Sequence, residues 1–134
     1  MIKQIKLIVC FGIVICAVLT FGCAFNLMDV KYQSAHIESI GDEVKPFILS
    51  ADTPIHGAPC GYSRSLRKGT KWEAIGRVAE GIVYRSRNQT LTIECSNIFE
   101  AYLVIAGDHL VGFYLPVEKA FSPLSEKIKL DMSY

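Results

Sequence analysis

The chain has 134 residues, enough for one domain, and carries a formal net charge of +1. All 13 acidic residues lie after residue 23, whereas Lys3 and Lys6 precede it, so the later part carries about −1. A nearly neutral domain has no general field that attracts nucleic acid, which excludes DNA and RNA as expected partners.

The first 25 residues form a basic and then an apolar segment. Lys3 and Lys6 are followed by residues 7–25, which contain no charged side chain. A core helix of this length would show polar positions at helical spacing, and this run has essentially none. The segment is therefore a signal peptide or a membrane anchor. In both cases the lysines hold their end in the cytoplasm and the rest of the chain crosses the membrane.

The apolar run ends in the sequence Leu-Thr-Phe-Gly-Cys, residues 19–23. This stretch resembles the lipobox of bacterial lipoproteins, in which a small residue precedes the cysteine that takes the lipid. The resemblance implies that residues 1–22 are removed and that Cys23 is acylated and binds the membrane. Ala24 after the cysteine implies sorting to the outer membrane. An uncleaved anchor and ordinary cleavage without a lipid remain open.

The five cysteines can be assigned by position. Cys10 and Cys16 lie in the apolar run, and lipidation would use Cys23, so Cys60 and Cys95 remain. Two cysteines in an oxidising periplasm predict one intramolecular disulfide. It would close a loop of roughly 36 residues, for which chain entropy suggests about 3–4 kcal/mol of stabilisation. Two free buried thiols are the alternative.

The chain after Cys23 divides into a tether and a domain. Residues 23–44 are mixed in character and predict a lipid-anchored tether that ends in a short helix or a first strand. Residues 45–134 predict a small β-domain closed by the disulfide, and residues 45–50 contain its first apolar strand. Residues 52–69 are rich in Gly, Pro, Ser and Thr without periodicity, which predicts a long loop.

From Trp72 onward the pattern predicts short strands rich in β-branched and aromatic residues. Gly107 and Asp108 predict a hairpin, and Pro116 and Pro123 limit the stretch around them to edges and turns. The fold class is therefore mainly β, a small barrel or sandwich. The predicted strands after residue 70 are 72–78, 81–85, 90–95, 98–106, 109–117 and 127–132.

Two stretches resemble bacterial SH3-type domains of the cell envelope. Residues 66–76 are similar to the turn and strand of such domains, and residues 112–116 to their closing strand. The separation is longer than in a minimal module, so an additional hairpin is needed. The resemblance implies an SH3-like barrel and says little about function.

A basic cluster without acidic residues lies in the long loop and just after it: Arg64, Arg67, Lys68 and Lys71. A solvated loop is the ordinary interpretation of such a cluster. The functional interpretation is contact with an anionic surface such as lipid headgroups, lipopolysaccharide or a cell-wall polymer. His56 and Cys60 are too few to bind zinc, which usually takes three or four ligands, so no metal and no cofactor is expected.

Three functional classes remain. The leading one is a non-enzymatic cell-envelope lipoprotein whose β-module binds a protein or wall component in the periplasm. The second is a small inhibitor or exclusion factor with residues 52–69 as a protruding loop. The third is an enzyme, because Cys60 and His109 resemble the cysteine and strand histidine of NlpC-type cell-wall hydrolases. That class requires a free Cys60 at a helix start, and residues 61–69 make a poor helix, so no catalytic residue is assigned.

Overall fold

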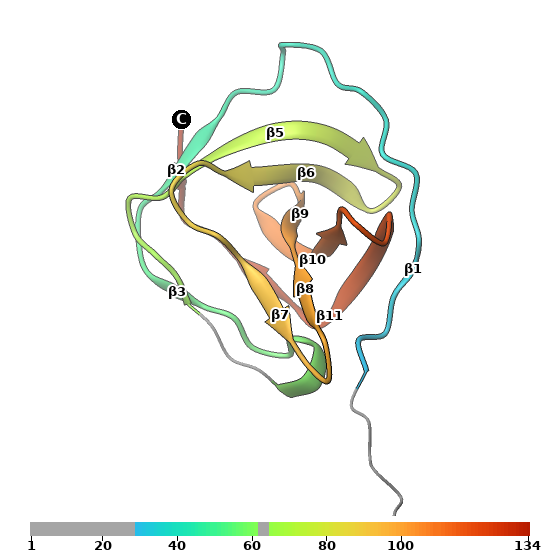
Figure 1. The fold of residues 1–134 in the computed structure, drawn as a ribbon. Coiled ribbons are helices and arrows are strands. Elements are labelled where there is room, and N and C mark those ends of the chain that lie inside the picture. Colours follow the sequence, from blue (N-terminus) through green and yellow to red (C-terminus); the bar gives the residue numbers. More distant parts are fainter. Residues whose placement is uncertain (1–28, 62–64) are drawn as a thin grey trace, which may run out of the picture.

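The computed structural model describes residues 29–61 and 65–134 (Figure 1). The predicted signal segment, Cys23 and Arg64 lie outside this part of the chain. The regular elements of the described residues are all strands except the short 3₁₀ helix η1, which confirms the mainly β fold class. The elements are β1 Gln33–Ser34, β2 Phe47–Leu49, β3 Thr53–Pro54, η1 Pro59–Gly61, β4 Ser65–Leu66, β5 Lys71–Val78, β6 Gly81–Ser86, β7 Thr92–Glu94, β8 Ile98–Glu100, β9 Tyr102–Ala106, β10 His109–Leu115, β11 Ala120–Lys129 and β12 Met132–Ser133.

Eight strands form one antiparallel sheet in the order β1-β11-β10-β9-β6-β5-β2-β12. The sheet must be strongly curled to satisfy the pairing of β12. This strand follows β11 after only Leu130 and Asp131, yet it pairs with β2 at the opposite edge of the sheet. Hydrogen bonds at this crossing tie Leu130 to Asp108 and Ser50 to Asp131. The described strands form no closed barrel, so the sandwich alternative describes the fold better. Two small ribbons, β3–β4 and β7–β8, lie outside the main sheet.

The larger core lies inside the curl of the sheet. Trp72, Phe47 and Phe113 are its largest fully buried side chains. The ring of Phe47 meets that of Tyr84 edge-on with a centroid separation of 5.0 Å, a geometry that aromatic pairs favour. Ile93 and Phe99 of the β7–β8 ribbon belong to the same cluster. The ribbon therefore closes one side of the core although it pairs with no strand of the main sheet.

A second, smaller core lies on the outer face of the sheet, beneath residues 33–38, here called the crossing segment. It begins as β1 on β11 and ends at Glu38, whose backbone exchanges hydrogen bonds of 2.8 and 2.9 Å with Arg77 of β5. Ala35 and Ile37 pack on the apolar outer residues of the sheet. Gly76 permits this approach, because a Cβ there would come within 2.9 Å of the Glu38 carbonyl oxygen.

The crossing segment changes the expected boundary of the domain. Residues up to 44 were predicted to be a tether, yet Val30 is already buried and the Ser122 hydroxyl donates a 2.8 Å hydrogen bond to the Lys31 carbonyl. The folded domain therefore includes the residues from Val30 onward. Figure 1 shows this part of the chain running along one side of the sheet before it reaches β2.

Three other expectations differ in detail. The predicted strand 98–106 is two strands, because Ala101 turns its N–H to the Leu91 carbonyl, 3.0 Å away. The predicted loop 52–69 contains the β3–β4 pair. Pro123 lies inside β11 rather than ending it, and it faces Gly112 of β10 next to a β-bulge. Its missing N–H is tolerated because β1 pairs only with the first two residues of β11.

Alkaline pH should destabilise the domain through Tyr84. Burial raises the pKa of this phenol above its ordinary value of 10.0, and the nearby Tyr134 raises it further. The unfolded chain therefore loses this proton first. The stabilisation contributed by the protonated Tyr84 phenol is fully present below about pH 10. It is lost as the pH rises through the higher pKa of this phenol in the folded state.

We expect the free energy of unfolding, measured by denaturant titration, to fall more steeply above pH 10 in the wild type than in Tyr84→Phe. Tyr134→Phe should remove only the smaller, charge-dependent part of the effect. Identical slopes in the wild type and Tyr84→Phe would contradict this account.

Candidate binding surface

The basic cluster predicted from the sequence lies mainly on the connection between β4 and β5. Arg67, Lys68 and Lys71 are exposed, and Gly69 makes the turn between them with a positive φ of 80°. Thr70 points inward and is 2 % exposed. The loop therefore holds its basic side chains outward from a fixed backbone.

Gln89 fixes this loop through both ends of its side-chain amide. Its Oε1 accepts hydrogen bonds of 3.3 Å from the Arg67 N–H and from the Thr70 hydroxyl. Its Nε2 donates a 3.3 Å hydrogen bond to the Ser65 carbonyl. One side chain from the turn after β6 thus satisfies three groups of the β4–β5 connection.

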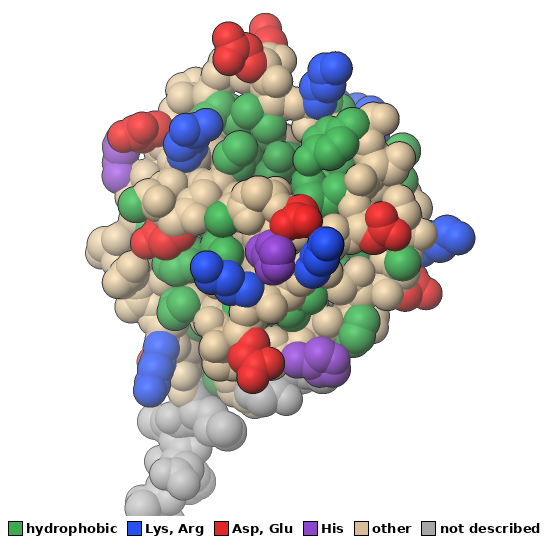
Figure 2. Space-filling view, turned by 180° about the vertical axis from the view of Figure 1, so that it is seen from behind, with side chains coloured by type: hydrophobic (Ala, Val, Ile, Leu, Met, Phe, Trp, Pro, Cys, Tyr) green, Lys and Arg blue, Asp and Glu red, His purple; other side chains and the backbone are tan. Residues whose placement is uncertain are grey.

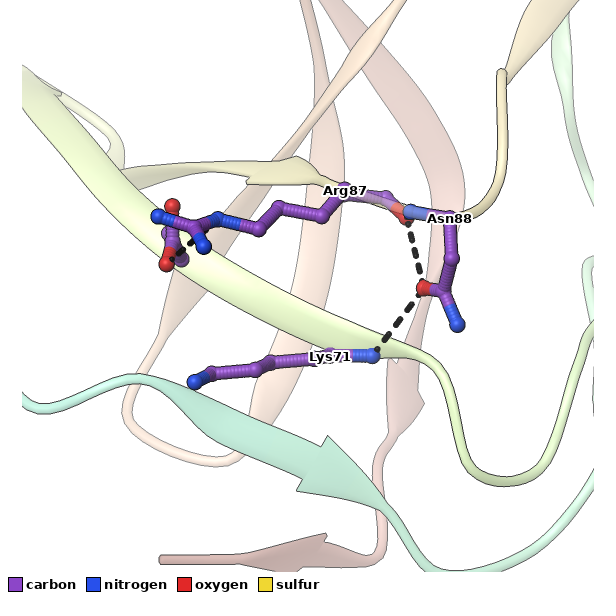
Figure 3. Close-up of polar contacts among 5 residues, drawn as sticks. Lys71, Arg87 and Asn88 are labelled. Atoms are coloured by element: carbon purple, nitrogen blue, oxygen red, sulfur yellow. Dashed lines mark hydrogen bonds and ion pairs between the residues drawn. The ribbon is translucent and has the colours of Figure 1, made fainter.

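Asn88, beside Gln89, holds the same two segments together. Its Oδ1 accepts a 3.4 Å hydrogen bond from the Lys71 N–H, and its carbonyl accepts one of 3.2 Å from Arg67 Nη2. The Ser86 hydroxyl accepts hydrogen bonds from the backbone N–H groups of Asn88 and Gln89, and these bonds stabilise the turn after β6. In Figure 3 the side chains of Lys71 and Arg87 run in the same direction, away from Asn88.

Acidic side chains from elsewhere in the chain reduce the positive charge. Asp52 Oδ1 accepts a 2.7 Å hydrogen bond from the Lys68 N–H, and Glu73 Oε1 lies 2.8 Å from Arg87 Nε. We call Arg67, Lys68, Lys71, Arg87, Asp52 and Glu73 the basic surface, which carries four basic and two acidic side chains. No acidic residue interrupts the basic cluster in the sequence, but the fold brings Asp52 and Glu73 next to it. The surface still carries a net positive charge.

A small hollow of about 70 Å³ adjoins this surface and is lined by Trp72, Arg85 and Tyr102, among others. Burial raises the pKa of Tyr102, the negative charge of Glu100 adds to this, and Arg85 opposes it. The indole Nε1 of Trp72 is sealed from solvent and has no acceptor among the described residues. A hollow of this size admits a few water molecules at most, so we treat it as part of the packing.

The predicted disulfide is present. Cys60 in η1 is bonded to Cys95 after β7, with Cα atoms 5.6 Å apart, within the range that such bonds require. Cys60 adopts a positive φ of 64°. Ala58, Cys60 and Cys95 pack against the inner core. The bond therefore ties η1 to the β7–β8 ribbon.

The arrangement required for a cysteine hydrolase is not assembled in this structure. The Cys60 sulfur is bonded to Cys95, so it is no thiolate nucleophile. His109 Nδ1 lies 2.6 Å from Asp108 Oδ1, and Lys129 Nζ lies 3.8 Å from the other oxygen of that carboxylate. Within residues 29–61 and 65–134, no group of three or more His, Cys, Asp or Glu side chains is placed to bind a metal.

Sequence reasoning found Arg67, Lys68 and Lys71 but missed Arg87, Asp52 and Glu73. Asp52 and Glu73 join the surface through contacts that no local pattern encodes. The signal for the turn was the polar sequence Ser-Arg-Asn-Gln between two β-like runs, because such residues favour turns. The face turned away from the viewer in Figure 1 intersperses basic, acidic and apolar side chains (Figure 2).

Comparison with known proteins assigns this chain to no family. No family model matches the sequence, and no curated protein and no solved structure matches it significantly. In the part of the chain that the structure describes, no helix is long and apolar enough to span a membrane.

Proposed function

We propose that this chain is a non-enzymatic lipoprotein of the cell envelope, anchored by a lipid on Cys23 at the periplasmic face of the outer membrane. The observation that carries the proposal is the uncharged run of residues 7–25 that contains Gly22-Cys23. The Cys60–Cys95 bond supports it, because disulfides persist in oxidising compartments such as the periplasm. We propose that the β-domain binds a protein or wall component.

The basic surface is the candidate contact for that component. Arg67, Lys68 and Lys71 are exposed, and the hydrogen bonds of Asn88 and Gln89 hold their backbone in place. A preordered backbone lowers the entropic cost of binding. Exposed basic side chains bind anionic polymers and lipids through screened charge interactions. Carboxylate- or phosphate-bearing wall material is therefore the expected ligand class.

The inhibitor interpretation receives no support from the fold. It requires residues 52–69 to protrude, yet Thr53, Ile55 and Leu66 of this stretch are buried. The Asp52 carboxylate is also engaged with the Lys68 N–H. The described part of the segment is fixed to the core at these side chains and at Cys60, while Pro54, His56 and Gly57 between them are exposed.

Neutralising the basic surface should weaken binding to anionic wall material. We expect the full chain in detergent to sediment with purified peptidoglycan sacculi, and the variant Arg67→Gln/Lys68→Gln/Lys71→Gln to bind about tenfold more weakly at low salt. The matched control Lys45→Gln/Lys119→Gln/Lys127→Gln removes the same charge from other exposed positions.

Salt provides a second readout of this prediction. Binding of the wild type should weaken as ionic strength rises, because exposed charges are screened. Equal binding of the two triple variants would refute the basic surface as the contact, and it would leave the lipid anchor untouched.

A further inference from the structure

Two large apolar side chains are exposed at one end of the domain. Ile98 in β8 is 72 % exposed and Tyr32 is 48 % exposed. The Tyr32 ring lies 6.3 Å from the ring of Phe99, the residue that follows Ile98. Tyr32 and the β7–β8 ribbon therefore occupy the same end of the molecule.

The described chain begins at this same end. Asp29 and Lys31 line a groove of about 310 Å³ together with Pro59 and Cys60 of η1. In Figure 1 the first described residues lie at the same end of the domain as the β7–β8 ribbon. We call Tyr32, η1 and Ile98 the anchor-side end.

The length of the chain before Asp29 limits how far this end can lie from the membrane. Six residue steps separate Cys23 from Asp29, and a fully extended chain spans at most about 3.6 Å per residue, or about 22 Å in all. An uncleaved apolar anchor ending near residue 25 would leave an even shorter connection. Either kind of anchor keeps the anchor-side end next to the lipid.

We propose that the anchor-side end rests on the bilayer surface, with Ile98 and Tyr32 entering the boundary between headgroups and acyl chains. This proposal rests on the anchoring assigned under the proposed function. Tyrosine favours that boundary because its ring is apolar and its hydroxyl polar. Asp29 and Lys31 carry opposite charges, so the contact is apolar and needs no anionic lipid.

Single exposed apolar side chains are common and carry no meaning by themselves. Ile48, Val117 and Tyr134 are also exposed in this domain. What distinguishes Ile98 and Tyr32 is that they flank the place where the short connection to the anchor begins. The four basic side chains of the basic surface come from other elements, namely the β4–β5 connection, the start of β5 and the turn after β6. The basic surface therefore stays available for a periplasmic ligand.

Fluorescence quenching by lipid tests the contact. The full chain, purified with its anchor, is reconstituted into phosphatidylcholine vesicles that contain bromine-labelled acyl chains. Ile98→Trp and Tyr32→Trp place a fluorophore at the anchor-side end. The matched control is Ile48→Trp on β2, where the native side chain is 47 % exposed against 48 % for Tyr32. Trp72 contributes a constant background because it is 1 % exposed.

We expect the added emission of Ile98→Trp and Tyr32→Trp to be quenched about twofold or more and shifted to the blue, with Ile48→Trp unaffected. The quenching should be unchanged by salt. Vesicle flotation separates the two proposals. Chains that float without quenching at Ile98→Trp and Tyr32→Trp overturn the surface contact alone, whereas chains that fail to float overturn the anchoring and the contact with it.

Discussion

Replacing Cys60 or Cys95 by serine should lower the free energy of unfolding of the oxidised protein by about 3–4 kcal/mol. The bond spans 35 positions of sequence and joins η1 to the end of β7. Neither element belongs to the main sheet, so few backbone hydrogen bonds compensate for its loss. For a small domain this is a large share of the net stability.

Denaturant unfolding with and without reductant measures the effect. The two single variants should match the Cys60→Ser/Cys95→Ser double variant, because all three remove one shared bond. Cys16→Ser makes the same chemical change in the apolar run and should leave the domain unaffected. Single variants as stable as the wild type would contradict a stabilising bond. A wall-cleaving activity lost in both Cys60→Ser and His109→Ala would instead support the hydrolase interpretation.

Replacing Cys23 by serine should abolish acyl labelling of the chain in cells. Only a thiol at this position can take the thioether-linked lipid that a lipobox implies. The lipobox resemblance also implies that the unprocessed precursor should accumulate at higher mass. Labelling with a fatty-acid analogue, followed by gel migration, measures both effects.

Cys16→Ser is again the matched control, since it keeps Gly22-Cys23 intact and should be labelled like the wild type. Equal labelling of the wild type and Cys23→Ser would refute the lipoprotein assignment. If the wild type, Cys23→Ser and Cys16→Ser all remain unlabelled and all migrate at the mass of the full chain, the result would instead indicate the uncleaved anchor.

The elements predictable from the sequence are those whose signals are local. β5 and β6 follow from runs rich in Val, Ile and Tyr around a two-residue turn. The β9–β10 hairpin follows from Gly107-Asp108, and Gly107 does adopt a positive φ of 65°. The disulfide followed from counting, because only two cysteines remained for an oxidising compartment.

The elements missed by the sequence depend on contacts between distant positions. β1 consists of two exposed residues, so it shows no alternation, and only its pairing with β11 makes it a strand. The break at Ala101 depends on Leu91, ten positions earlier. β11 tolerates Pro123 because most of one edge of this strand is unpaired. Such features depend on tertiary context, which a single sequence does not display.

The crossing segment determines how a mechanical load on the proposed anchor would reach the domain. Any pull through Asp29 acts first on buried Val30 and on the Ser122–Lys31 hydrogen bond. It then acts on the two residue pairs of β1 with β11 and on the Glu38–Arg77 hydrogen bonds. The loop closed by Cys60 and Cys95 begins later in the chain, so the covalent bond lies outside the first load path. Peeling residues 29–40 from the sheet would release about 40 Å of extended chain. With the anchoring proposed above, the domain would then move away from the membrane under tension while the inner core loses only Val30.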